Sequence, residues 1–186
     1  MLAALYGTPH TVRLLTDHGA DPNAVDKNDA SALLFAAGDL AKVRLLVDRG
    51  ANVNARSALG NTPLIAAAAH SDNLDVVKLL IEKGADVHAK NVNNVSVLAA
   101  AVVASDAATV RFLLDQGCKP GHINNLFGAA GNSLLEIAAQ YGNGEIVELL
   151  LSRAADVNTS DSNFAGHALN YALLSQKPEI ARRLIE

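Results

Sequence analysis

The 186-residue sequence has no tryptophan, a single cysteine and few aromatic rings, and each scarcity excludes a class of protein. Aromatic residues make up only 4% of the chain although 50% of it is apolar, so we do not expect a sheet sandwich filled by large rings. Cys118 has no second cysteine to pair with, which excludes an internal disulfide and favours a reducing compartment. We therefore expect an intracellular protein, with the cytoplasm as the simplest location.

Long apolar runs and an excess of positive charge are also missing. No stretch approaches the roughly 18 apolar residues of a membrane-spanning helix. The opening MLAALYGTPH lacks the basic start and long apolar stretch of a signal peptide. The formal net charge is −4, so the chain as a whole does not attract phosphate groups. We expect no membrane insertion and no nucleic acid partner.

What the sequence does contain is an internal repeat with two markers. The first is a glycine that stops an apolar and charged segment, with alanine in the fifth place: Gly19, Gly50, Gly84, Gly117 and Ala154. The second opens each unit two residues before a leucine: Ser31, Thr62, Ser96, Ser133 and His167. The steps between successive markers lie between 31 and 37 residues for both sets, a period typical of stacked repeats.

Local rules predict that each unit is a helix, a tight turn, a second helix, a stop and an extended linker. In GNTPLIAAAAH, Thr62 is a good N-cap and Pro63 takes the first helical position, where its missing N–H costs nothing. In NLDVVKLLIEKG, Gly84 supplies a left-handed stop after a helix whose apolar residues follow helical spacing: Leu74, Val77, Leu80 and Ile81. The second unit has the shorter AAGDLAKV, so its first helix or the following turn should be clipped.

This pattern closely resembles the ankyrin repeat, whose motif pairs a Thr-Pro-Leu-His helix start with a Gly-Ala-Asp-Val-Asn stop. GNTPLIAAA followed by DVVKLLIEKGADV is the nearest match, and the resemblance covers essentially the whole chain. It implies an all-α solenoid of stacked helix–turn–helix units with projecting β-turn fingers and a concave face. We expect a single ankyrin-repeat domain over 1–186, divided into repeats 1–25 (partial), 26–56, 57–90, 91–123, 124–160 and 161–186 (partial).

Both ends of the chain carry apolar residues where a solenoid normally has a polar cap: Leu2, Ala3, Leu5, Leu184 and Ile185. We interpret the chain as a window cut from a longer array. The alternative is a complete short protein with frayed terminal helices.

Patterns that carry catalysis or bind cofactors are not found. The GNGE segment at Gly142 lacks the spacing and the lysine of a phosphate-binding loop, and the six histidines form no ligand pair. Cys118 has no identifiable base and takes the alanine place of a stop, which favours a packed small residue. SLLE, from Ser133 to Glu136, fits a reciprocal capping box rather than a catalytic acid. We therefore expect no enzyme activity, no cofactor, no metal and no small-molecule substrate.

The resemblance implies a protein–protein interaction scaffold that binds another protein through its concave face and finger turns. One alternative is a regulatory or targeting arm of a larger enzyme whose catalytic domain lies outside this chain. Another is a structural spacer without a ligand.

Finger positions and inner-helix ends supply the expected partner-binding residues: Leu59, Asn61, His70, Val92, Asn93, Asn94, Phe127, Tyr141 and Phe164. Phe127 and Tyr141 are the favoured anchors, since aromatic side chains are enriched among binding hot spots. The alternative for Phe127 and Phe164 is that each ring folds back to seal its own turn. The resemblance also implies that asparagines at the end of the stop can be hydroxylated, here Asn23, Asn54 and Asn158.

Overall fold

The structure, a computed structural model, describes residues 1–120, 122–123, 132–141, 143–153, 155 and 168–185. The chain divides into two compact units, Met1–Val92 and Asn93–Glu186. We call them the N-terminal unit and the C-terminal unit. Expected finger residues Phe127 and Phe164 lie outside the described residues, as does Asn158.

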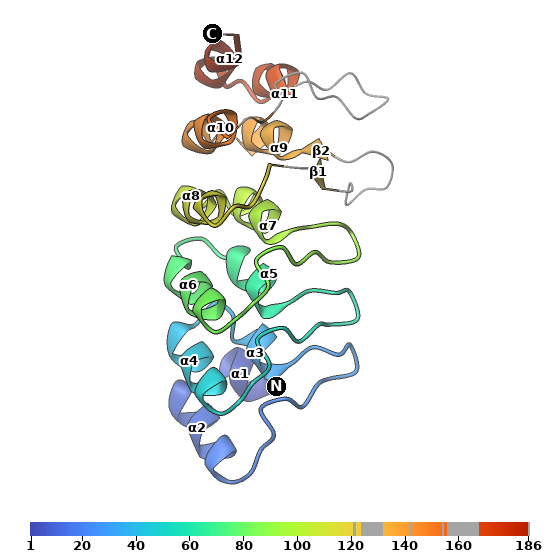
Figure 1. Ribbon diagram of the computed structural model, residues 1–186, viewed down its shortest axis with the longest axis vertical. Coiled ribbons are helices and arrows are strands. Elements are labelled where there is room, and N and C mark those ends of the chain that lie inside the picture. Colours follow the sequence, from blue (N-terminus) through green and yellow to red (C-terminus); the bar gives the residue numbers. More distant parts are fainter. Residues whose placement is uncertain (121, 124–131, 142, 154, 156–167, 186) are drawn as a thin grey trace. The chain divides into compact units, whose positions relative to one another are not determined.

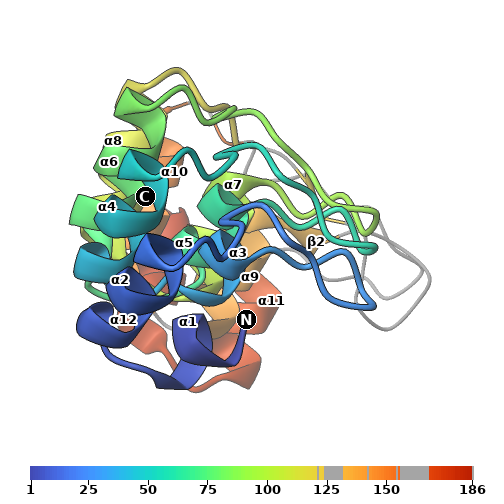
Figure 2. The ribbon, with the colours of Figure 1, turned by 90° about the horizontal axis from the view of Figure 1, so that it is seen from below.

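The N-terminal unit consists of three helix pairs: α1 (Leu2–Tyr6) with α2 (Pro9–Asp17), α3 (Ala32–Phe35) with α4 (Leu40–Asp48), and α5 (Pro63–Ala68) with α6 (Leu74–Glu82). The inner helices α1, α3 and α5 contact one another in order, and the outer helices α2, α4 and α6 do the same. Within this unit the inner helices lie between the outer helices and the projecting linkers, or fingers (Figures 1 and 2).

The C-terminal unit repeats this arrangement. Its pairs are α7 (Val97–Val103) with α8 (Ala107–Asp115), α9 (Leu134–Tyr141) with α10 (Gly144–Leu151), and α11 (Ala168–Leu174) with α12 (Pro178–Ile185). The inner helix α9 contacts α7 and α11, and the outer helix α10 contacts α8 and α12. Two short antiparallel strands, β1 (His122–Ile123) and β2 (Asn132–Ser133), lead into α9, with His122 opposite Ser133.

The predicted helix starts at Ser31, Thr62, Ser96 and Ser133 are confirmed, as are the predicted glycine stops, whereas His167 and Ala154 lie outside the described residues. Thr62 caps α5, because its Oγ1 accepts the N–H of Ile65 at 3.2 Å. After α6, Gly84 has a φ of +87°, and the N–H groups of Gly84 and Ala85 donate to the carbonyls of Ile81 and Leu80, both at 2.9 Å. These two hydrogen bonds close the last helical turn. They require a residue at position 84 that tolerates a positive φ. The other stop glycines share this conformation: Gly19, Gly50 and Gly117.

Leucine pairs on the outer helices form the core of each unit, as predicted. Six of them are between 0% and 8% exposed: Leu79, Leu80, Leu113, Leu114, Leu149 and Leu150. On α6 the buried arc differs in part from the prediction. Leu74 and Ile81 are only half-buried, whereas Val76 is buried. The reason is that α6 packs against both α5 and its outer neighbour α4, which turns the buried arc towards Val76 and Leu79.

The second repeat is clipped, as its length predicts. Its inner helix α3 has four residues, whereas α5 has six and α7 has seven. The turn that follows α3 contains Gly38, and a Cβ atom placed on that glycine would lie 3.4 Å from the ring of His70 in the next repeat. The His70 ring therefore packs against this shortened turn.

Asparagine side chains join successive stops in the N-terminal unit. Asn54 Nδ2 donates to the Gly84 carbonyl at 2.9 Å, and the Asp86 N–H donates to Asn54 Oδ1 at 2.9 Å. Asn23 makes the equivalent pair of bonds one repeat earlier, to the Gly50 carbonyl and from the Asn52 N–H. Each side chain thus fixes the stop of the following repeat through both its amide oxygen and its amide nitrogen.

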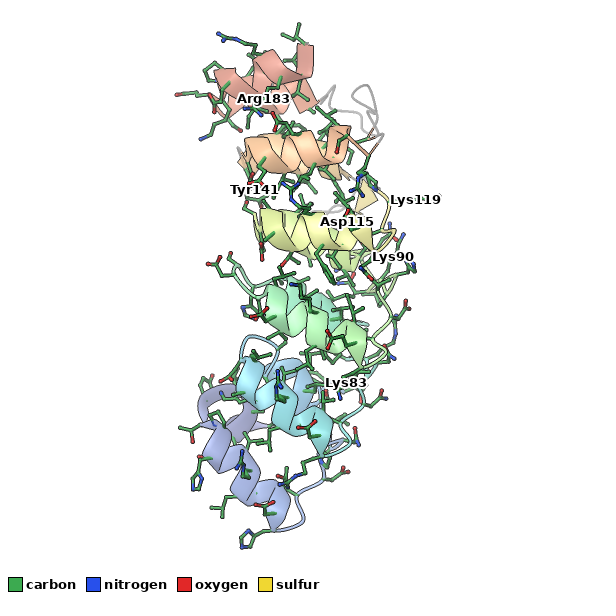
Figure 3. All side chains as sticks on the ribbon, turned by 60° about the vertical axis from the view of Figure 1, so that its left-hand side comes forward. Lys83, Lys90, Asp115, Lys119, Tyr141 and Arg183 are labelled. Carbon is green, nitrogen blue, oxygen red and sulfur yellow. The ribbon has the colours of Figure 1, made fainter. Side chains whose placement is uncertain are left out.

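Ion pairs link neighbouring outer helices on the surface. In the C-terminal unit they join Arg111 to Glu145 at 2.9 Å and Arg153 to Asp115 at 2.5 Å, and they join Arg183 of α12 to Glu148. Asp115 and Arg183 are labelled in Figure 3. These groups are partly exposed, so each pair stabilises the stack by only about 0.2–1 kcal/mol.

Candidate protein-binding surface

The fingers of the N-terminal unit are fastened to one another at their tips. The Ala58 N–H donates to the Asn28 carbonyl at 2.8 Å, and the Val92 N–H donates to the Leu59 carbonyl at 3.0 Å. Within the middle finger, the Gly60 N–H closes a turn by donating to the Ser57 carbonyl at 2.7 Å. We call residues 25–29, 56–60 and 90–92 the finger ribbon. Its backbone is held by hydrogen bonds between repeats rather than by each loop alone.

Two residues with exposed apolar side chains are joined by a backbone hydrogen bond at the edge of this ribbon. Leu59 is 58% exposed and Val92 is 63% exposed, and the bond between their backbones keeps them adjacent. We call them the tip pair. Turn positions usually hold Gly, Asn, Asp or Ser, so two neighbouring exposed aliphatic residues on a projecting turn are unusual. Both were expected from the sequence as partner-binding residues.

Gly60 allows the two fingers to approach closely. Its φ is +73°, and a Cβ atom there would lie 3.3 Å from both the Asn91 Cα and the Val92 nitrogen. A larger residue would combine an unfavourable conformation with a tight contact against backbone. Gly60 is therefore required for the spacing that brings Leu59 beside Val92.

Asn61 lies in the same finger but has a different position from the tip pair. It is half-buried, and its Oδ1 accepts a hydrogen bond from Asn91 Nδ2 at 2.8 Å. In this structure its side chain fastens two fingers together. Arg56 acts similarly, since its Nη1 donates to the Lys90 carbonyl at 3.1 Å.

In the C-terminal unit, the expected finger residues Asn93 and Asn94 differ from each other. Asn93 is exposed, whereas Asn94 is half-buried and has a φ of +60°. Asn94 takes the repeat position of Gly60, two residues before the residue that opens the repeat. Asparagine tolerates this left-handed conformation better than most residues, so the turn itself accounts for Asn94.

An aromatic or imidazole ring lies at or just beyond the end of three inner helices, two in the N-terminal unit and one in the C-terminal unit. His70 is exposed beyond α5, and Tyr141 at the end of α9 is 57% exposed. Figure 3 shows Tyr141 at the end of the C-terminal unit's helices away from Lys119. Tyr6, at the end of α1, is 80% exposed and was missed by the sequence reasoning. Its signal was available, because Tyr6 precedes the N-cap Thr8 by two residues, as Tyr141 precedes the N-cap Asn143.

The groups considered for chemistry have structural roles. Glu136 is buried and completes the predicted capping box: the Ser133 N–H donates to its Oε2 at 2.8 Å, and its own N–H donates to the Ser133 Oγ at 3.1 Å. Cys118 is packed in the stop after α8, and burial raises the pKa of its thiol to about 11. Its thiol is therefore protonated at neutral pH. Within the described ranges, no group of three or more His, Cys, Asp or Glu residues could hold a metal ion.

None of the helices that the structure describes combines the length and the apolar character needed to cross a membrane.

His10, His18, His70 and His88 are all exposed at or near turns. Of the basic pair on α12, Arg182 is exposed to solvent and Arg183 forms a salt bridge with Glu148.

Comparison with known families explains the repeat. The chain matches the family described as ankyrin repeats (3 copies) twice, over residues 1–91 and 96–186. A comparison with curated proteins gives no match. The two family matches cover nearly the whole sequence, and the described helices confirm the expected all-α fold. Ankyrin repeats generally mediate protein–protein interactions and are typically non-catalytic. The chain belongs to the ankyrin-repeat family.

Proposed function

We propose that this chain is a protein-binding scaffold that holds a partner protein through its fingers and the exposed ends of its inner helices. The observation that carries the proposal is the tip pair, Leu59 and Val92. Both side chains are exposed, and the backbones of the two residues are joined by a hydrogen bond. His70 is a further proposed contact in the same unit, and Asn93 and Tyr141 are proposed contacts in the C-terminal unit. Phe127 and Phe164 remain proposed contributors from the later fingers.

Rigidity supports a binding role for the tip pair. Binding a partner costs free energy when flexible loops become ordered, and much of that cost is absent where the loop is already fixed. The backbone hydrogen bonds that hold this region include those from Ala58 to Asn28, from Val92 to Leu59 and from Gly60 to Ser57. A partner can therefore cover the two side chains without first ordering the fingers.

The size of the expected contribution follows from the exposed side chains. Complete burial of a Val or Leu side chain is worth about 1.5–3 kcal/mol. Since Leu59 and Val92 are 58% and 63% exposed, a partner that covers them gains part of this amount. Truncation of either side chain to alanine should cost about 1–2 kcal/mol of binding free energy, which weakens binding about 5- to 30-fold.

The test begins with a partner captured from cell extract by the intact chain and then purified. It is titrated against the parent chain and against Leu59→Ala, Val92→Ala and Tyr141→Ala. Leu14→Ala is the matched control, because Leu14 is 50% exposed but lies on the outer helix α2. A melting curve of each variant shows whether the fold is intact.

The expected result is weaker binding by the three surface variants, with parental melting temperatures and parental binding by Leu14→Ala. If the finger variants bind as tightly as the parent, or lose binding only because they unfold, the proposed surface is wrong. If Leu14→Ala is the variant that weakens binding, the partner contacts the outer helices instead.

A further inference from the structure

We infer that the partner segment that covers the tip pair is acidic as well as apolar: a peptide segment with one or two aliphatic or aromatic side chains and Asp or Glu residues beside them. This inference rests on the proposed function and adds the chemical class of the bound segment. It follows from the charges of the finger ribbon, which differ in sign from the charge of the chain as a whole.

The finger ribbon displays three exposed cations. Arg56 and Lys90 take the same place in successive fingers, six residues before the residue that opens each repeat. Lys27, in the first finger, takes the place that Val92 holds two fingers later. Lys27 therefore lies in the same row as Val92, and Arg56 and Lys90 lie two positions before that row. Figure 3 labels Lys90 on the linker that follows α6.

The carboxylates of the ribbon are fewer, and one of them is already bonded. Asp26 Oδ1 accepts the N–H of Asn28 at 2.8 Å and the N–H of Ala30 at 2.9 Å. Asp29 is the other carboxylate of the ribbon and is exposed. With three cations and two carboxylates, the ribbon has a formal charge of +1, whereas the whole chain has −4.

The three cations are not neutralised within the part of the chain that the structure describes. Its salt bridges involve Lys42, Arg49, Arg111, Arg153 and Arg183, and none involves Lys27, Arg56 or Lys90. Arg56 uses Nη1 to bond the carbonyls of Lys90 and Gly60, which holds its guanidinium at the ribbon near the tip pair. A bound carboxylate would find the Arg56 charge already held in position and the Lys27 and Lys90 ammonium groups exposed nearby.

An acidic and apolar segment satisfies both features of the surface. Its apolar side chains would cover Leu59 and Val92, and its carboxylates would face Lys27, Arg56 and Lys90. Charge complementarity of this kind mainly raises the association rate and the specificity for a partner, and it makes binding sensitive to salt. A basic segment would meet the same cations unfavourably, although it fits the net charge of the whole chain.

The test uses an unbiased library of random 12-residue peptides displayed on phage and selected on the immobilised full chain. Peptides that also bind a Leu59→Ser/Val92→Ser double variant, which leaves the charge of the ribbon unchanged, are removed. The enriched sequences are made synthetically and titrated at low and high salt against the parent chain and three double variants: Leu59→Ala/Val92→Ala, Lys27→Glu/Lys90→Glu and Arg13→Glu/Arg44→Glu. The last pair is the matched control, because Arg13 and Arg44 are exposed on the outer helices α2 and α4 of the same unit.

We expect the enriched peptides to be net negative with at least one large apolar residue, and to bind at least tenfold more weakly at high salt. The Lys27→Glu/Lys90→Glu variant should lose at least tenfold in affinity, while Arg13→Glu/Arg44→Glu binds like the parent. If Lys27→Glu/Lys90→Glu melts at a lower temperature, Lys27→Ala/Lys90→Ala replaces it, with a smaller loss of the same sign expected.

Several outcomes would overturn the inference: enrichment of basic or uncharged peptides, no enrichment, or equal losses from both pairs of charge reversals. The proposed function fails separately. If the partner captured by the intact chain loses affinity with Leu59→Ala/Val92→Ala but not with Lys27→Glu/Lys90→Glu, the finger site stands and its acidic specificity is wrong. If the partner is insensitive to both variants, the finger site itself is wrong.

Discussion

Two leucines at the same position of different repeats allow the stacking account to be tested with one kind of substitution. Leu80 in α6 and Leu15 in α2 both stand four residues before the stop glycine of their repeat. Leu80 is 0% exposed in a helix that packs against α5 and α4, whereas Leu15 is 47% exposed in α2, the first outer helix of the N-terminal unit. Changing each leucine to alanine removes the same three carbon atoms, which are fully buried at position 80 and about half exposed at position 15.

The expected costs follow from this difference. Three buried carbons are worth about 2.4 kcal/mol at about 0.8 kcal/mol each. A cavity left in a packed core adds to that amount, so Leu80→Ala should destabilise the unit by about 3–5 kcal/mol. At Leu15 only about half of this burial free energy is lost, because the side chain is already about half exposed, and no closed cavity forms there. Leu15→Ala should therefore cost about 1 kcal/mol.

The assay is urea unfolding of the parent and both variants, followed by far-ultraviolet circular dichroism. Both leucines lie in the N-terminal unit, so we expect both variants to shift the same unfolding transition. A change in midpoint without a change in slope reports a change in stability. Equal costs for the two substitutions, or a larger cost for Leu15→Ala, would refute the proposed stacking register.

Three further substitutions test individual contacts. Asn54→Ala removes two hydrogen bonds between stops and should lower the free energy of unfolding by about 1–3 kcal/mol; an unchanged urea midpoint would contradict this role. Gly60→Ala should cost about 1–2 kcal/mol because of its positive φ, and Gly60→Asn should cost less; the reverse order of melting temperatures would argue against the turn geometry. Cys118 has a pKa of about 11 in the folded chain, raised by burial from 9.0, so the folded state keeps its proton longer than the unfolded state. The free energy of unfolding should therefore fall more steeply between pH 9 and 11 in the parent than in Cys118→Ala, with a difference in slope of at most about 1.4 kcal/mol per pH unit. Parallel pH profiles of the two proteins would exclude this effect.

Features set by local interactions could be predicted from the sequence. The stop at Gly84 depends on residues within one helical turn, and the caps at Thr62 and Ser133 depend on a backbone N–H three residues away. Periodicity then identified the buried leucine pairs, because they occupy the same position in successive repeats. For these features the sequence neighbours are also the physical neighbours.

Features set by contacts between repeats were harder to predict. The half-burial of Leu74 depends on how α6 packs between α5 and α4, which helical spacing alone does not describe. Asn61 stays a predicted partner contact, but helical and turn spacing could not predict that its side chain bonds Asn91, a residue 30 positions away in the next finger. Tyr6 was missed because the first repeat lacks the helix-start motif that aligned the others.

The partner's footprint on the chain tests the central claim, that a protein binds at the fingers of the N-terminal unit. Hydrogen–deuterium exchange of the intact chain, with and without the captured partner, reports which amides are covered. The account predicts slower exchange at residues 25–29, 56–60 and 90–92, with the outer helices α2, α4 and α6 unchanged. Protection centred on those outer helices, with the finger ribbon unchanged, would contradict it.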